Sequence, residues 1–326
     1  ESYDEAAQRI WRVGDAATLP STELQRELVR LATLAPSSHN TQCWRFATPS
    51  PQRMTILPDL ARRCPAVDPD DHHLYVSLGC AAENLVQGAL AYGLKAQATF
   101  DAQRDAIAIA LEPTAAQSTP LYKAIAERQC TRGEYDGKPL TAEDLAALTQ
   151  AAASDSVGLA LLTDKPALER VLEFVVQGNT AQINDPAFVD ELKAWIRFSG
   201  SDAVRLGDGL YAASSGNPVL PAWLGRTLFG FVFKPKAEND KIARQLRSSA
   251  GVAVFTAKNA DKTNWVEVGR AYERFALQAA ALGIRNAMLN QPVEVASLRE
   301  PFASAVGAAG RRPDLVVRFG RGPKLP

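Results

Sequence analysis

The sequence contains two matching stretches, VSLGCAAENLVQGALAYGL at residues 76–94 and EVGRAYERFALQAAALGI at residues 267–284. Three pairs of residues align at one constant offset: Gly79 with Gly269, Glu83 with Glu273, and Gly93 with Gly283. Small and apolar residues recur in both stretches at helical spacing, and each stretch ends in a glycine suited to the left-handed position after a helix. We therefore predict two buried helices of the same design.

A similar unit surrounds each predicted helix. A run rich in β-formers follows each of them, at 105–111 and at 314–319. An amphipathic helix opened by a Ser or Thr precedes each of them, at 21–35 and at 141–152. These elements predict an internal duplication, with one half at residues 1–118 and the other at 119–326.

The second half carries roughly 70 extra residues before its long helix, far more than an ordinary loop. This insertion covers about 185–245 and is rich in turn residues, tryptophan and phenylalanine. Such segments are often lids over a site, and a decorative surface subdomain is an equal alternative.

Composition excludes several classes of function. The chain has 326 residues, of which 46% are hydrophobic, and 36 basic residues balance 36 acidic ones. This balance gives no overall field that favours nucleic acid or an anionic membrane, so we expect neither as a partner. The four cysteines have no metal spacing and there are only three histidines, so no metal site is predicted. No glycine-rich nucleotide loop is present either.

Three short segments are candidates for a binding site. The run PSSHNTQCW at 36–44 places short polar side chains after a predicted helix, which suits contact with the edge of a planar heterocycle such as a flavin, or an ordinary hydrogen-bonded loop. Arg128 and Arg132 share one face if helical, and form either a phosphate clamp or common surface pairs. Asn290 and Gln291 precede Pro292, where backbone N–H groups face either an acceptor such as flavin N5 or an ordinary loop.

Together these segments resemble the nitroreductase family of FMN flavoproteins, in its fused two-copy, Acg-like branch. The run at 36–44 resembles the family's Pro-Ser-Ser-x-Asn-x-Gln-Pro-Trp loop, with Cys43 at the usual proline. The run RQCTR at 128–132 resembles its Arg-x-Ser-x-Arg phosphate clamp, with Cys130 where Ser or Thr is usual. The run at 289–291 matches its loop beside flavin N5.

The resemblance implies an FMN site, and two basic residues near the C-terminus are expected to complete its phosphate end, with Lys324 as an alternate. The site residues that it implies are Pro36, Ser37, Ser38, Asn40, Gln42, Arg128, Cys130, Arg132, Leu289, Asn290, Gln291, Arg318 and Arg321. No catalytic acid, base or nucleophile is expected, because a flavin carries the chemistry itself.

The implied fold is an α+β sandwich, duplicated around a pseudo-two-fold axis, with a mixed central sheet and flanking helices. Family members normally form homodimers with two shared flavins, so this chain is expected to be a fused dimer that acts as a monomer or forms a further homodimer. The 36–44 run has no counterpart at 151–157, and the arginine and Asn290 segments are clear only in the second half. We therefore predict one composite site and one FMN per chain.

The implied activity is NAD(P)H-dependent reduction of nitroaromatics, quinones or similar small aromatic acceptors. One alternative is a lidded FMN-binding or flavin-storage stress protein, in which residues 201–236 lie over the flavin and turnover is low. Another is a protein-interaction module that has lost its flavin. The expected location is cytoplasmic, or periplasmic if a twin-arginine signal preceded Glu1.

Overall fold

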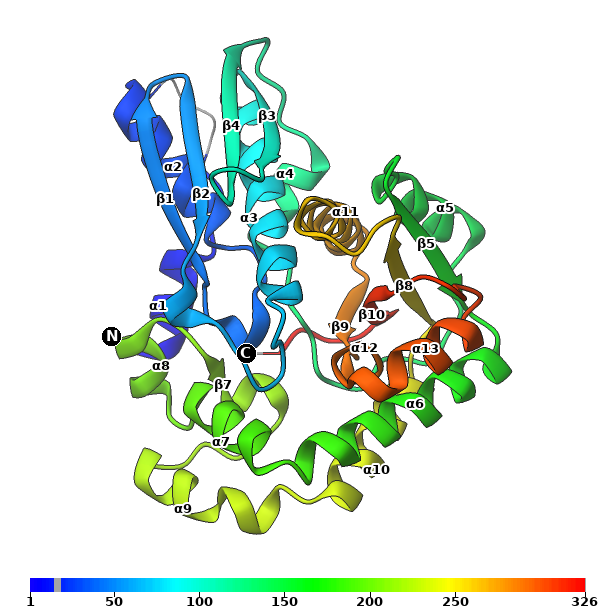
Figure 1. Cartoon of the computed structure of the whole chain (residues 1–326). Helices are drawn as coiled ribbons and strands as arrows, with labels where there is room; N and C mark the ends of the chain where they lie inside the picture. Colours follow the sequence, from blue (N-terminus) through cyan, green and yellow to red (C-terminus); the bar gives the residue numbers. More distant parts are fainter. Residues whose placement is uncertain (15–18, 326) are drawn as a thin grey trace.

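The computed structural model describes residues 1–14 and 19–325, which form two antiparallel sheets around a central pair of helices (Figure 1). The first sheet has the spatial order β1 (Trp44–Ser50), β2 (Arg53–Pro58), β4 (Ala106–Pro113), β3 (Leu94–Asp101). The second has the order β5 (Val157–Leu162), β8 (Gly251–Ala257), β10 (Pro313–Gly320), β9 (Arg285–Met288). The predicted α+β class is confirmed.

The arrangement of the strands differs from the prediction of one mixed central sheet. Every strand pair in the two sheets is antiparallel. Tight hairpins join β1 to β2 and β3 to β4, and a hairpin connection allows only antiparallel pairing. The strands form two separate sheets, and two helices lie between them at the centre of the molecule.

The two central helices are the two matching stretches. They are α3 (His72–Ala91) and α11 (Lys262–Ala281), which lie side by side between the sheets in Figure 1. A Cβ added to Gly79 would lie 2.0 Å from the Val266 carbonyl oxygen, and one added to Gly269 would lie 1.9 Å from that of Val76. This contact is reciprocal, because Gly79 faces Val266 and Gly269 faces Val76, and these two valines occupy equivalent positions in the two helices.

The order of elements supports the predicted duplication. In each half a helix is followed by two strands, then by a central helix and then by two further strands, and the spatial orders of the two sheets correspond strand by strand. The opening helices are α2 (Ser21–Ala32) and α5 (Ala142–Ala151). The reciprocal glycine contact lies where a pseudo-two-fold axis would pass.

The halves differ mainly in one connection. Two residues join β1 to β2, whereas residues 163–250 join β5 to β8, so the extra segment extends beyond the expected 185–245 on both sides. It contains α6 (Lys165–Ile183), α7 (Pro186–Trp195), β6 (Ile196–Arg197), α8 (Gly200–Leu206), β7 (Leu210–Tyr211), the 3₁₀ turn η3 (Ala212–Ser215), α9 (Ala222–Val232) and α10 (Pro235–Arg247). The predicted insertion did not include α6. The apolar periodicity of α6 resembles that of an ordinary core helix, so the sequence does not mark α6 as part of an insertion.

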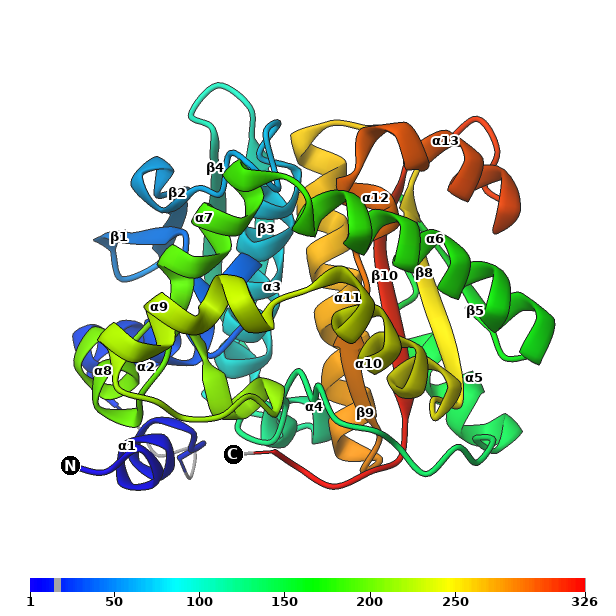
Figure 2. The ribbon, with the colours of Figure 1, turned by 90° about the horizontal axis from the view of Figure 1, so that it is seen from below.

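The long connection and the C-terminal helices cover the outer face of the second sheet, while its inner face packs on α11. Helices α6, α10, α12 (Gln291–Glu294) and α13 (Ala296–Ala305) pack on its outer face through a second apolar cluster that includes Val171, Val254 and Phe302 (Figure 2). Every residue of β8 and β10 is accordingly buried, whereas β4 alternates between buried and exposed positions over most of its length. The remaining elements are α1 (Tyr3–Ile10), α4 (Pro120–Ala124), and the 3₁₀ turns η1 (Ser38–Asn40) and η2 (Leu60–Arg62).

The helices were also compared with the requirements of a membrane span. Among the helices of the described ranges, none combines the length and hydropathy that a membrane-spanning helix needs.

Candidate functional site

A cavity of about 620 Å³ lies where the two halves and the long connection meet. Its walls come from the turn after α2, from α3, from the β9–α12 loop and from β10, and residues of α6 to α10 close the remaining side. This volume falls in the range of small-molecule and cofactor sites.

Most of the residues predicted from the sequence meet in this cavity. Those that line it are Pro36, Ser37, Ser38, Cys130, Arg132, Leu289, Asn290, Gln291 and Arg318. They come from both halves, because the first three follow α2 and the others lie beyond residue 118. The cavity is therefore lined by residues from both predicted halves.

Two predicted residues instead hold the long connection. The Asn40 side-chain amide donates to the Gly209 carbonyl at 2.8 Å, and the Asn40 carbonyl accepts from the Gly209 N–H at 2.9 Å. The Gln42 amide donates to the Gly207 carbonyl at 2.5 Å. Neither residue lines the cavity, because the connection occupies the space that their side chains face.

The two other predicted arginines also lie outside the cavity lining. Arg128 is buried, with its Nε 3.4 Å from Glu273 Oε1, and donates to the Leu34 carbonyl. Arg321 is about half exposed and donates to Asp144 at 2.8 Å and to the Leu282 carbonyl. Sequence alone could not separate these from the arginines that do line the cavity, because only the tertiary fold places the acidic partners.

Arg318 and Arg132 make one end of the cavity positive. Arg318 is almost completely buried, stacks over Tyr135 at 4.3 Å, and donates to the carbonyls of Gly133 and Gln245. Burial and the nearby Arg132 lower the pKa of Arg318. Among the described residues neither arginine forms an ion pair, although Glu134 influences Arg318 from an exposed position where it pairs with Arg244. A buried cation without a carboxylate favours an anion beside it.

The β9–α12 loop is held rigidly against the second sheet. Asn290 Oδ1 accepts from the Val316 N–H at 2.9 Å, and the Leu289 N–H donates to the Val316 carbonyl at 2.7 Å. Gln291 begins α12, where the first N–H groups lack intrahelical partners. Its side-chain Oε1 is buried and has no hydrogen-bond partner among the described residues.

Comparison with known proteins gives relatives of one kind. The chain is 27% identical to "Putative NAD(P)H nitroreductase Rv3131" of Mycobacterium tuberculosis over 93% of its length and 87% of that protein's. The chain is thus similar, over most of its length, to a protein named as a putative nitroreductase. No family model matches the sequence.

Two solved structures of nitroreductases have a distant likeness to this chain. A nitroreductase with bound FMN from Desulfitobacterium hafniense has a TM-score of 0.42 and 16% identity, over 64% of this chain and 94% of that one. The FMN-dependent nitroreductase NfnB from Mycobacterium smegmatis, in complex with NADPH, has a TM-score of 0.41 and 14% identity, over 62% of this chain and 87% of that one.

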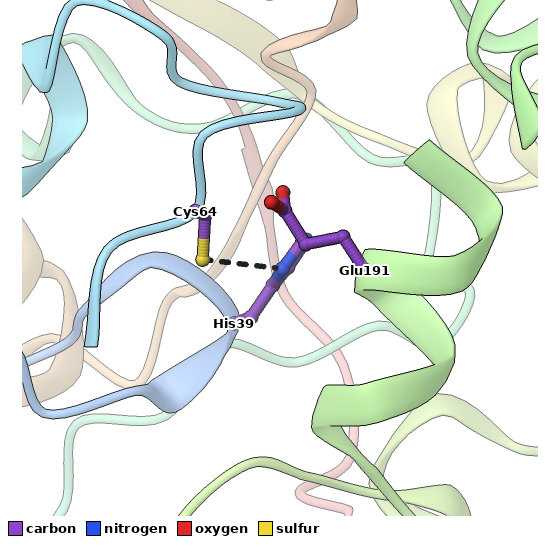
Figure 3. Close-up of side chains that lie close together, drawn as sticks. All are labelled: His39, Cys64 and Glu191. Carbon is purple, nitrogen blue, oxygen red and sulfur yellow. Dashed lines mark hydrogen bonds between the residues drawn. The ribbon is translucent and has the colours of Figure 1, made fainter. Parts of the chain in front are cut away.

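A side-chain cluster that the sequence does not mark lies between the predicted loop and the long connection. In Figure 3, the His39 ring faces Cys64, with 3.8 Å between Nδ1 and Sγ, and Glu191 of α7 lies beside them. The Glu191 carboxylate accepts from the N–H groups of Ala66 and Val67 at 2.8 and 3.1 Å. These bonds already occupy both carboxylate oxygens, so the cluster fastens α7 to the first half.

The charges of this cluster follow from its burial. Burial and Arg132 lower the pKa of His39 to about 4, and burial raises the pKa of the Cys64 thiol. Both groups are therefore neutral near pH 7. His39 lines the cavity and presents an uncharged imidazole there.

The long connection supplies cavity residues that no local motif marked. They include Phe198, Tyr211, Leu228, Phe229 and Lys241. Lys241 donates to the Ser215 carbonyl at 2.8 Å, which ties α10 to η3. The only signal in the sequence was the concentration of aromatic residues within the insertion, which indicates burial without saying against what.

Proposed function

We propose that the chain binds one FMN in the composite cavity and acts as an NAD(P)H-dependent oxidoreductase on nitroaromatics, quinones or similar small aromatic acceptors. The observation that carries the proposal is the buried Arg318 beside Arg132, without a carboxylate partner among the described residues, at one end of a cavity of about 620 Å³. A flavin phosphate is an anion of the size and charge that two guanidinium groups bind well.

The other walls also fit a flavin. Ser37 and Ser38 offer hydroxyls and backbone groups to a heterocycle edge, and Asn290 and Gln291 line the cavity beside them. The apolar residues of the long connection suit the flat ring system. A bound FMN supplies the hydride and electron transfer, while the protein binds it, orients it and excludes water. The names of the relatives support the same activity.

A flavin-storage or stress-related binding protein is the second candidate, because the long connection forms one whole side of the cavity. The contacts of Asn40, Gln42 and Arg62 with residues 207–209 hold that side in place. A flavin there would be covered on that side by the connection. Such a protein would be yellow and would turn over slowly.

Anaerobic addition of NADPH to the purified, FMN-loaded protein separates these candidates. The proposal predicts that the oxidised flavin absorbance bleaches within seconds and returns when a quinone or nitroaromatic is added. A yellow protein that stays oxidised supports the storage protein instead. A colourless protein that does not bind added FMN contradicts both and supports an interaction module.

The anion site has its own test, which needs no turnover. Arg132→Gln removes one of two charge-assisted contacts, so we expect the Kd for FMN to rise by about tenfold to a hundredfold. Arg321→Gln is the matched control, because Arg321 lies outside the cavity lining. Equal affinity of the two variants, measured by flavin fluorescence quenching, would refute the assigned phosphate end.

A further inference from the structure

The surface of α9 is unusually apolar. Most of the large apolar side chains that the described residues expose lie between residues 206 and 232. The most exposed are Trp223 at 71% and Phe231 at 74%. Figures 1 and 2 show α9 as an outer element of the long connection, away from both sheets. Contiguous exposed patches of this kind mark interaction surfaces.

One side of α9 is firmly attached to the protein. Phe229 is buried, lies against Phe198 with 6.1 Å between ring centroids, and stacks on Phe233 at 4.7 Å. Gly225 contacts Phe198 so closely that an added Cβ would lie 2.4 Å from its ring. Trp223 and Phe231 are eight residues apart and therefore share the opposite, outward side. The outward side is thus presented by an anchored helix.

The charge of this segment is one-sided. Residues 209–237 contain no Asp or Glu and three cations, although the whole chain has a formal net charge of zero. The cations are Arg226, Lys234 and Lys236, all exposed, and none of them forms an ion pair with the described residues, although Arg226 is close enough to Asp202 to help lower the pKa of that carboxyl. The expectation that no membrane surface attracts this protein rested on the net charge, which conceals this local excess.

We infer that the α9 surface, made of Val219, Trp223, Arg226, Leu228, Phe231, Val232, Lys234 and Lys236, docks on a lipid bilayer that contains anionic lipids. Interfacial helices combine aromatic and aliphatic side chains on one face with Lys and Arg beside it, and tryptophan prefers the headgroup region. A protein partner is less well matched, because lysine is depleted in protein interfaces.

The docked surface adjoins the cavity. Leu228 and Val232 are both exposed and part of the cavity lining. A bilayer on the α9 surface therefore lies against the side of the cavity that the long connection forms. This inference concerns the surface alone and does not depend on whether the cavity holds FMN.

Co-sedimentation of the full chain with vesicles tests the inference. We expect binding to vesicles of phosphatidylcholine mixed with phosphatidylglycerol, and much weaker binding to phosphatidylcholine alone. Each cation near an anionic surface contributes about fivefold, so the triple variant Arg226→Gln, Lys234→Gln, Lys236→Gln should bind on the order of a hundredfold more weakly. The double variant Trp223→Ser, Phe231→Ser should lose on the order of tenfold or more.

Matched controls use exposed residues elsewhere on the chain. Arg104→Gln, Lys138→Gln and Lys258→Gln remove the same charge from other surfaces, and Leu60→Ser removes another exposed apolar side chain. Equal loss of binding in the controls and in the α9 variants would overturn the inference, as would failure of the wild-type chain to bind anionic vesicles. A third outcome would also overturn the inference: a wild-type chain that does not bind vesicles but self-associates, with self-association lost in the Trp223→Ser, Phe231→Ser variant. The α9 surface would then bind a second copy of the protein and not a bilayer.

Discussion

Four arginine residues were predicted from the sequence as site residues, and in the structure they differ in their partners. Arg128 faces the buried Glu273, and Arg321 faces Asp144. Arg318 has carbonyls and an aromatic ring around it, and neither Arg318 nor Arg132 forms an ion pair with a carboxylate of the described residues. Because an isolated buried charge is costly, this difference in partners is the reason for proposing an anion at their end of the cavity.

His39 predicts a pH dependence of stability. Its folded-state pKa of about 4 lies below the ordinary value of 6.5, because burial and Arg132 disfavour the charged ring. Between these pH values the unfolded chain takes up a proton that the folded chain does not, so the free energy of unfolding falls as the pH falls from about 6.5 towards 4. Above pH 6.5 His39 has no effect of this kind.

The variant His39→Asn isolates this effect, since asparagine tolerates the positive φ of 48° at this position. We expect the variant's unfolding free energy to fall less steeply over this pH range, by at most about 1.4 kcal/mol per pH unit for one proton. Urea unfolding of the flavin-free protein at several pH values measures it. The pKa of the buried His72 is also lowered, but His72 is present in both proteins and cancels in the comparison. Parallel curves would refute the prediction.

At the scale of elements, the contact between α3 and α11 depends on two glycines. Gly79→Ala places a methyl group 2.0 Å from the Val266 carbonyl oxygen, so the helices must separate. Overpacking of this kind costs about 1–3 kcal/mol or more, and we expect the free energy of unfolding to fall by at least about 3 kcal/mol. Chemical denaturation measures it.

The control for that variant is Gly230→Ala in α9, where an added Cβ meets nothing within 4 Å. Replacing an exposed helical glycine by alanine should leave stability unchanged or raise it by about 0.5–1 kcal/mol. Similar effects of the two substitutions would show that the central helices do not meet through Gly79.

The long connection is fastened to the first half at Asp208. Its carboxylate accepts from Arg62 Nη1 at 2.8 Å and from Arg197 Nη2 at 2.7 Å. Asp208→Asn keeps the shape and removes the charge that holds both arginines. We expect residues 196–211 to exchange amide hydrogens about tenfold to a hundredfold faster, because hydrogen bonds to a charged group contribute about 1.5–3 kcal/mol.

Asp202→Asn is the control for the fastening. Asp202 pairs with the exposed Arg205 within α8, and such surface pairs contribute little. Exchange should remain at the wild-type rate in this variant and in the sheets of both variants. If Asp208→Asn leaves exchange in residues 196–211 unchanged, the connection is held by other contacts.

At the scale of the whole molecule, the two halves correspond in their strands and central helices but not in their loops. The turn after α2 lines the cavity, whereas the turn after α5, residues 152–156, carries Ala-Ala-Ser-Asp-Ser and leads directly into β5. The positive end formed by Arg132 and Arg318 belongs to the second half alone. Only one of the two pseudo-equivalent positions has both sets of residues.

This asymmetry predicts one FMN per chain. Flavin released by acid and quantified by absorbance should equal the molar amount of protein, with a single class of sites in a titration of the flavin-free chain. Two flavins per chain would contradict the composite site, while a ratio of one that Arg132→Gln reduces would agree with it.

The sequence by itself determined the class of the fold, the central helices and a set of residues of which most line the cavity. These follow from local signals: helical spacing of small residues, glycines after the helices, and short polar runs at fixed places in a repeated unit. The matching glycines Gly79 and Gly269 even mark the point where the halves meet.

Only the tertiary structure decided which polar groups face the cavity and which are already satisfied. Asn40 and Gln42 bond to the long connection, and Arg128 turns to Glu273, because partners more than a hundred residues away in sequence compete for them. The antiparallel sheets and the surface of α9 likewise depend on what packs against each face. Local patterns describe a side chain, but burial and long-range partners determine the free energy of leaving it unpaired.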